Sequence, residues 1–159
     1  MPAPDGLAVA RRRPLDELER AIDYSFLDMA LLERAMRHGS AAEGKPGEDN
    51  RRLAFLGDAV IELAMREEVY NAQPLAERGK LSEDTDKHVQ DKDLAQRARA
   101  LGLQDWLAVG RGEAKNDFGE ERRLADAFEA LAGAIYLDAK AHAFPVIRRM
   151  MGRADATGR

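Results

Sequence analysis

At 159 residues the chain has the usual length of one domain, which is enough to bury a hydrophobic core without disulfides. Cysteine is absent, which excludes a disulfide framework, a thiolate metal site and a cysteine nucleophile. The net charge of −4 argues against a protein whose whole surface coats nucleic acid. It does not exclude phosphate binding through divalent ions, because carboxylates that hold such ions create a locally positive field.

The ends of the chain and its hydropathy predict where the domain lies. No apolar run reaches the roughly 18 to 20 residues that a bilayer span needs, and the N-terminus lacks the apolar segment of a signal peptide. We therefore expect a cytoplasmic protein with no membrane partner. Residues 1–14 predict a flexible N-terminal tail, 15–151 a single domain, and 152–159 a C-terminal tail.

The first half of the domain is predicted to hold two short helices, a loop and a long helix. Apolar residues recur at helical spacing over 15–22, and Asp28 is a suitable N-cap for a second short helix. The glycines and proline of 39–49 predict a loop. The pattern of 50–70 then predicts a long helix, with an apolar stripe formed by Leu53, Leu56, Val60 and Leu63.

The second half continues with helices and no convincing strand pattern. A charged helix is expected over 81–100, ending at Gly102, followed by a short buried element at Trp106. A second long helix is expected over 121–138 and a last helix over 141–151. The predicted fold class is therefore all-α. The core stripe of the second long helix comprises Leu124, Phe128, Leu131 and Ile135.

Two acidic residues flank that second core stripe. Asp126 and Glu129 are three positions apart, so their side chains share one helix face beside apolar surface. Acids in such a place must be solvated, paired or bound to metal, because burying bare charge is unfavourable. A hard cation with oxygen ligands meets that need. An ordinary solvated helix face is the alternative.

A glycine accompanies the carboxylates on each long helix. Gly57 precedes Asp58 on the first, and Gly133 follows Glu129 on the second. Glycine inside a helix often marks the close approach of another backbone. The two helices are therefore expected to cross closely and to bring Asp58 towards Asp126 and Glu129.

The same segments carry a family resemblance over about residues 15–151. NRRLAFLGDAV resembles the ribonuclease III signature N-E-R-L-E-F-L-G-D-[SA]-V, and LADAFEALAGAIYLD is similar to the second acidic motif of that family. LERAMRHGS before the signature, GKLSEDTDKHVQDKDLAQRARALGL between the motifs, and GRGEAK before the second motif follow the family order. Together these motifs are highly specific.

The resemblance implies an all-helical homodimer that cleaves double-stranded RNA. It implies an endoribonuclease dependent on Mg²⁺, with Mn²⁺ as a substitute, that leaves 5′-phosphate and 3′-hydroxyl ends during RNA processing or ribosomal RNA maturation. Asp58, Asp126 and Glu129 match three of the four acidic positions, so they are expected to be catalytic and to bind the metal. The dimer is expected to use apolar residues of the signature helix, notably Phe55.

The chain departs from the family pattern at three acidic positions. Ala54 stands where the family has its fourth metal-binding Glu, and Arg51 and Arg78 replace two further Glu residues. An alternative is therefore a catalytically degenerate domain that binds RNA or serves as a scaffold without cutting it.

The Mini-ribonuclease III branch offers a different interpretation of Ala54. Its signature resembles L-A-Y-I-G-D-A-[VI]-Y-E, with Ala at the same place and Glu four residues after the Asp, as Glu62 follows Asp58 here. Glu62 is thus a further candidate metal ligand, and an ion pair with Arg66 is the alternative. By this resemblance no double-stranded-RNA-binding domain of the kind that ordinary members carry is expected, whereas LADAFEAL resembles the ordinary branch, so both branches remain open.

Basic residues near the second acidic motif are candidate RNA contacts. Arg111 and Lys115 lie in the glycine-interrupted loop, and Arg122 begins the second long helix, where its charge opposes the helix dipole. We expect these three to contact phosphates, with a solvated loop as the alternative for the first two. His38, His88 and His142 lack metal-ligand spacing and are expected to be structural or on the surface.

Overall fold

The structure, a computed structural model, describes residues 13–42, 44–114 and 117–152. Within these ranges every regular element is a helix, and the β contact is an isolated parallel bridge between Arg37 and Ala108. The predicted all-α fold class is confirmed. The helices are α1 Leu15–Ile22, α2 Met29–Ala35, η1 Gly39–Ala41, α3 Arg51–Ala72, α4 Arg78–Asp86, α5 Asp91–Leu101, η2 Leu103–Asp105, α6 Arg111–Ala114, η3 Asp117–Gly119, α7 Glu120–Ala139, η4 Lys140–His142 and α8 Ala143–Met150.

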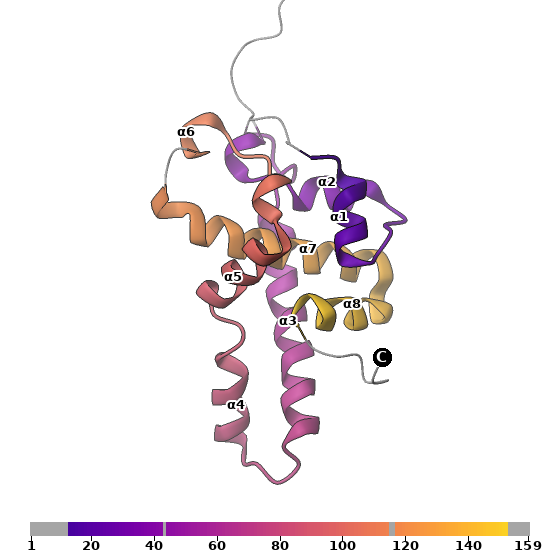
Figure 1. Ribbon diagram of the computed structural model, residues 1–159, viewed down its shortest axis with the longest axis vertical. Helices are drawn as coiled ribbons and strands as arrows, with labels where there is room; N and C mark the ends of the chain where they lie inside the picture. Colours follow the sequence, from indigo (N-terminus) through magenta and orange to yellow (C-terminus); the bar gives the residue numbers. More distant parts are fainter. Residues whose placement is uncertain (1–12, 43, 115–116, 153–159) are drawn as a thin grey trace, which may run out of the picture.

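The two long helices, α3 and α7, cross at the centre of the molecule (Figure 1). Gly57 and Gly133 lie at the crossing, as the sequence predicted. A Cβ atom built on Gly57 would stand 1.7 Å from the carbonyl oxygen of Glu129, and one on Gly133 would stand 2.3 Å from that of Leu53. Both positions therefore require glycine, because a side chain at either one would force the backbones apart.

Helix α7 is the centre of the hydrophobic core. Its predicted stripe is confirmed, since Leu124, Phe128, Leu131 and Ile135 are each at most 2% exposed. Helices α2, α3, α5 and α8 pack around it, and Trp106 fills the space beside α5. The indole of Trp106 donates to the carbonyl of Pro14, so the last residue of the predicted N-terminal tail contacts the domain.

The stripe predicted for α3 is only partly correct. Leu53 and Val60 are buried, but Leu63 is 56% exposed, and Ile61, Ala64 and Met65 are buried in its place. The C-terminal half of α3 packs against α4, and the two helices form a hairpin that extends from the body (Figure 1). The buried face of α3 therefore differs between its two halves, because different helices cover them.

The continuous helix predicted over 81–100 is wrong. Helix α4 ends at Asp86, the backbone at Gln90 is extended, and α5 begins at Asp91. The break has a packing reason, because α4 lies along α3 whereas α5 packs on α7 through Leu94, Ala95 and Ala98. The predicted end of α5 is confirmed, since Gly102 adopts a positive φ of 82° there.

Two further segments complete the description. The region predicted as a loop at 39–49 begins with the short helix η1, and its other described residues, 42 and 44–49, form no further helix or strand. Of the described residues, none belongs to a helix long and apolar enough to cross a membrane. Of the predicted tails at 1–14 and 152–159, residues 1–12 and 153–159 lie outside the described residues.

Candidate active site

Glu129 is the most buried acid of the candidate site. It lies at the α3–α7 crossing and is 7% exposed. Burial, followed by the negative charges of Asp58 and Asp126, raises the pKa of Glu129 to about 7. Of the described residues, none donates a hydrogen bond to its carboxylate, and the positive charge of Arg122 opposes the rise in its pKa only in part. The crossing therefore brings together the three acids that the sequence singled out.

Asp126 lies one turn before Glu129 on α7 and is held by Arg122. The Nε of Arg122 lies 3.0 Å from Oδ1 of Asp126, and its Nη1 lies 2.6 Å from Oδ2 of Asp91 on α5. Burial raises the pKa of Asp126, and the charge of Arg122 opposes that shift. Arg122 was predicted to contact RNA, and its positive charge at the start of α7 is here offset by two carboxylates.

Asp91 is the acidic residue that sequence reasoning did not single out. It is the first residue of α5, and its charge acts on both Asp126 and Glu129. An acid in the first turn of a helix is common, because it complements the helix dipole. Nothing in the local sequence therefore distinguished Asp91 from Asp93, and only the packing of α5 on α7 brings it to the site.

Asp58 and Glu62 occupy successive turns of α3. Asp58 is exposed, and Ala54, one turn earlier, is 6% exposed. The Oε1 atom of Glu62 accepts bonds from Nε and Nη2 of Arg66, at 2.9 and 2.5 Å. The ion pair that the sequence left open is therefore present.

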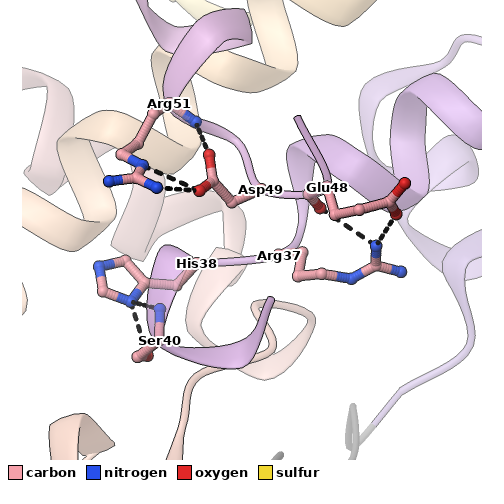
Figure 2. A network of polar contacts seen from close by, with 6 residues as sticks. All are labelled: Arg37, His38, Ser40, Glu48, Asp49 and Arg51. Carbon is pink, nitrogen blue, oxygen red and sulfur yellow. Dashed lines mark hydrogen bonds and ion pairs between the residues drawn. The ribbon is translucent and has the colours of Figure 1, made fainter. Parts of the chain in front are cut away.

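Polar contacts fix the segment that enters α3 beside the site (Figure 2). Asp49 accepts bonds from the backbone and guanidinium of Arg51, which lower the pKa of Asp49. On the same segment, Nδ1 of His38 accepts from the backbone N–H of Ser40 and lies 2.7 Å from the Ser40 hydroxyl. That hydroxyl also accepts from the backbone N–H of Gly110, so the segment is bound to the start of α6.

His38 has a structural role, as predicted. Its side chain caps η1, and burial lowers its pKa. The negative charges of Glu113 on α6 and of Asp126 on α7 act in the opposite direction and raise that pKa. An ion pair between Arg123 and Glu113, 2.9 Å apart, joins the α6 segment to α7. The segment around the acids is therefore fixed by several independent contacts.

Of the two remaining predicted RNA contacts, the structure describes Arg111. Arg111 is exposed on α6. Lys115 lies outside the described residues. A pocket of about 710 Å³ between α3 and α4 is lined by none of the predicted site residues, so it is separate from the acids.

The residue types at the crossing are those that hold a hard divalent cation. All three acids offer oxygen ligands, and a cation would offset the repulsion on Glu129 that the charge of Arg122 leaves. As they stand, however, no three carboxylate or imidazole groups of the described residues are arranged to hold an ion. Arg122 occupies one oxygen of Asp126 in this arrangement, so ion binding requires side-chain movement.

Known proteins are similar to this chain in both sequence and fold. Ribonuclease 3 of Pseudomonas paraeruginosa is 44% identical over 126 residues, covering 79% of this chain and 53% of that protein. Ribonuclease 3 of Nitratidesulfovibrio vulgaris is 44% identical over 131 residues, covering 80% and 51%. The chain thus spans about half the length of the curated relatives it matches.

A solved nuclease domain of ribonuclease III from Campylobacter jejuni superimposes with a TM-score of 0.80 at 33% identity. The match covers 87% of this chain and 96% of that one, whose description mentions structural flexibility in a region involved in dimer formation. The family model described as Ribonuclease-III-like matches residues 28–153. The chain therefore belongs to the ribonuclease III family and has the fold of its nuclease domain.

Proposed function

We propose that this chain is an endoribonuclease that cleaves double-stranded RNA with Mg²⁺, or with Mn²⁺ in its place. The products would carry 5′-phosphate and 3′-hydroxyl ends, and the role would be RNA processing, including ribosomal RNA maturation. Membership of the ribonuclease III family supports this reaction class. The resemblance of LAFLGDAV and LADAFEAL to the two acidic motifs supports the choice of site.

One observation carries the proposal. The α3–α7 crossing gathers Asp58, Asp126 and Glu129, and Glu129 is buried there without a hydrogen-bond donor among the described residues. Keeping a buried acid beside two other acids destabilises a protein unless a ligand compensates. A divalent cation is the ligand that oxygen donors select.

We assign the catalytic roles as follows. Asp58, Asp126 and Glu129 hold the ion, and Glu62 is a further ligand that replaces the acid missing at Ala54. A bound divalent ion would activate water and stabilise the charges of an in-line displacement at phosphorus. Arg111, Lys115 and Arg122 contact phosphates of the duplex, which is recognised mainly by its shape.

We further propose that the chain acts as a homodimer through exposed apolar residues of α3. Phe55 is 84% exposed on this helix, and Leu63 and Tyr70, which are 56% and 69% exposed, line the pocket between α3 and α4. Such an exposed apolar surface is typical of an interface. The description of the Campylobacter nuclease domain, which mentions dimer formation, supports a second copy as the occupant.

A degenerate domain that binds RNA without cutting it is the second candidate. The buried methyl group of Ala54 cannot bind a cation, and Arg51 and Arg78 carry positive charge where the family pattern has Glu. These positions favour RNA binding over catalysis if three acids are insufficient for the reaction.

One experiment separates the two functions. A plain RNA duplex is incubated with the purified chain in Mg²⁺ and in EDTA, and Glu129→Gln serves as the control. We expect cutting by the wild type in Mg²⁺ alone, with 5′-phosphate ends, and none by the variant. Retention of the duplex in a gel-shift assay without any cutting would favour the degenerate domain.

A further inference from the structure

The ion pair between Arg122 and Asp126 is not explained by the stability of helix α7 itself. Arg122 lies in the first turn, where a positive charge opposes the helix dipole. It also precedes its acidic partner by four residues, which is the less favourable order for an ion pair within a helix. The arginine is therefore explained better by the acids around it than by the helix that carries it.

Arg122 bridges two carboxylates from different helices. Its Nε contacts Asp126 at 3.0 Å, and its Nη1 contacts Asp91 at 2.6 Å. The side chain of Arg122 is 66% exposed, whereas that of Asp126 is 24% exposed. The guanidinium thus approaches the buried acids from the solvent side and has room to move.

Asp91 provides a second acceptor for the same guanidinium. Its side chain is 43% exposed and lies at the N-terminus of α5, outside the pair of acids on α7. Because different nitrogen atoms of Arg122 make the two contacts, the bond to Asp126 can break while the bond to Asp91 remains. Arg122 can thus compete with a cation for Asp126, and Asp91 can hold Arg122 after it has released Asp126.

We propose that Arg122 is an internal counter-ion that exchanges with the divalent cation at Asp126, and that Asp91 is the positioning residue that retains Arg122 when the cation binds. This inference rests on the proposed metal site. In the ion-free protein, the guanidinium offsets repulsion among the three acids. With the cation bound, Arg122 releases Asp126, keeps its bond to Asp91 and stays beside the site.

The test is Mn²⁺ binding to the full chain, measured by electron paramagnetic resonance of the free ion. Arg122→Ala removes the competitor and should tighten Mn²⁺ binding about two- to five-fold, the range expected for an exposed ion pair. Asp91→Asn should weaken binding by a similar factor. Arg99→Ala is the matched control, because Arg99 joins the same two helices by pairing with Glu120 and does not contact Asp126.

The double variant distinguishes exchange from the general effect of charge. If Asp91 acts through Arg122, then Asp91→Asn should have little effect on Mn²⁺ binding in the Arg122→Ala background. Equal weakening in both backgrounds would overturn the inference, since Asp91 would then act on the ion directly. Unchanged affinity in Arg122→Ala would overturn it as well.

Mn²⁺ binding to the wild type and to Glu129→Gln separates failure of the Arg122 exchange from failure of the proposed function. If the wild type binds Mn²⁺ and Glu129→Gln does not, the metal site stands whatever the exchange variants do. If the wild type binds no Mn²⁺, or Glu129→Gln binds it equally well, both the metal site and the exchange are refuted.

Discussion

Glu129 makes the ion-free protein less stable at high pH. Its pKa is raised from 4.5 to about 7 in the folded chain, so the folded state binds the proton more tightly than the unfolded state. The free energy of unfolding therefore falls as pH rises from about 4.5 to about 7. In EDTA at pH 8, Glu129→Gln should be more stable than the wild type by roughly 1 to 3 kcal/mol.

This difference should disappear below about pH 4.5, where Glu129 is protonated in both states. Urea unfolding at pH 4 and pH 8 measures it. Mg²⁺ should then stabilise the wild type at pH 8 and leave the variant unchanged, because ligand binding favours only a folded state that holds the ion. Equal stability of the two proteins in EDTA at pH 8 would contradict the conclusion that burial of the Glu129 carboxylate destabilises the ion-free fold.

Glu62 tests whether a carboxylate has moved along α3 to compensate for Ala54. If Glu62 is a ligand, Glu62→Ala should weaken the apparent Mg²⁺ affinity of cleavage by about 10- to 100-fold. Ala54→Glu should partly restore it, because both positions lie one turn from Asp58 on the same face. Arg66→Ala is the control, since it removes the ion pair and leaves the carboxylate in place.

The two interpretations of Glu62 predict different Mg²⁺ titrations for Glu62→Ala and Arg66→Ala. A simple surface ion pair predicts that Glu62→Ala and Arg66→Ala behave alike and that neither alters the Mg²⁺ titration. If Glu62 is a metal ligand, only Glu62→Ala should alter the Mg²⁺ titration. Wild-type behaviour of Glu62→Ala at every Mg²⁺ concentration would refute the compensation.

Individual residues could be predicted where a local pattern marks them. Helical spacing predicts that Asp126 and Glu129 share a face beside an apolar stripe, and the two glycines predict the approach of Asp58, whereas their assignment as metal ligands comes from the resemblance to the family motifs. Asp91 could not be predicted, because its relation to Asp126 depends on how α5 packs on α7. The four-residue spacing is enough to predict the contact of Arg122 with Asp126, but it does not predict the ion pair of Arg122 with Asp91.

At the scale of elements, the α3–α7 crossing depends on glycine. Gly57→Ala should destabilise the fold by roughly 3 kcal/mol or more, because its Cβ would meet the Glu129 carbonyl of a rigid helix. Gly79→Ala on α4 is the matched control, since a Cβ there meets nothing within 4 Å. That variant should be neutral or more stable by about 0.5 kcal/mol.

Thermal unfolding of the two variants measures this difference. Because the α3–α7 crossing positions the three acids, a folded Gly57→Ala protein should also bind Mn²⁺ less tightly. A Gly57→Ala variant as stable as the wild type would show that the helices do not approach as closely as described.

Element boundaries were predictable only where the local sequence determines them. Gly102 ends α5 and Asp28 caps α2, because each makes a local backbone contact that its residue type favours. The break between α4 and α5 and the exposure of Leu63 depend instead on which helix lies opposite. Periodicity identifies an apolar face and does not reveal its partner.

For the whole molecule, the exposed face of α3 predicts dimerisation. Phe55→Ser should shift the chain from dimer to monomer at micromolar concentration, because it removes a large apolar side chain that is 84% exposed. Leu27→Ser is the control, since Leu27 is 90% exposed but lies between α1 and α2. Sedimentation of a wild type that is only monomeric would refute the dimer.

The position of the bound ion tests the central claim most directly. Crystals of the full chain grown or soaked with Mn²⁺ give an anomalous difference map that locates the ion without reference to activity. We predict a peak within about 2 to 2.6 Å of carboxylate oxygens of Asp126 and Glu129, with Asp58 facing it. Well-ordered acids without a peak, or a peak at other residues, would contradict the assignment of the α3–α7 crossing as the metal site.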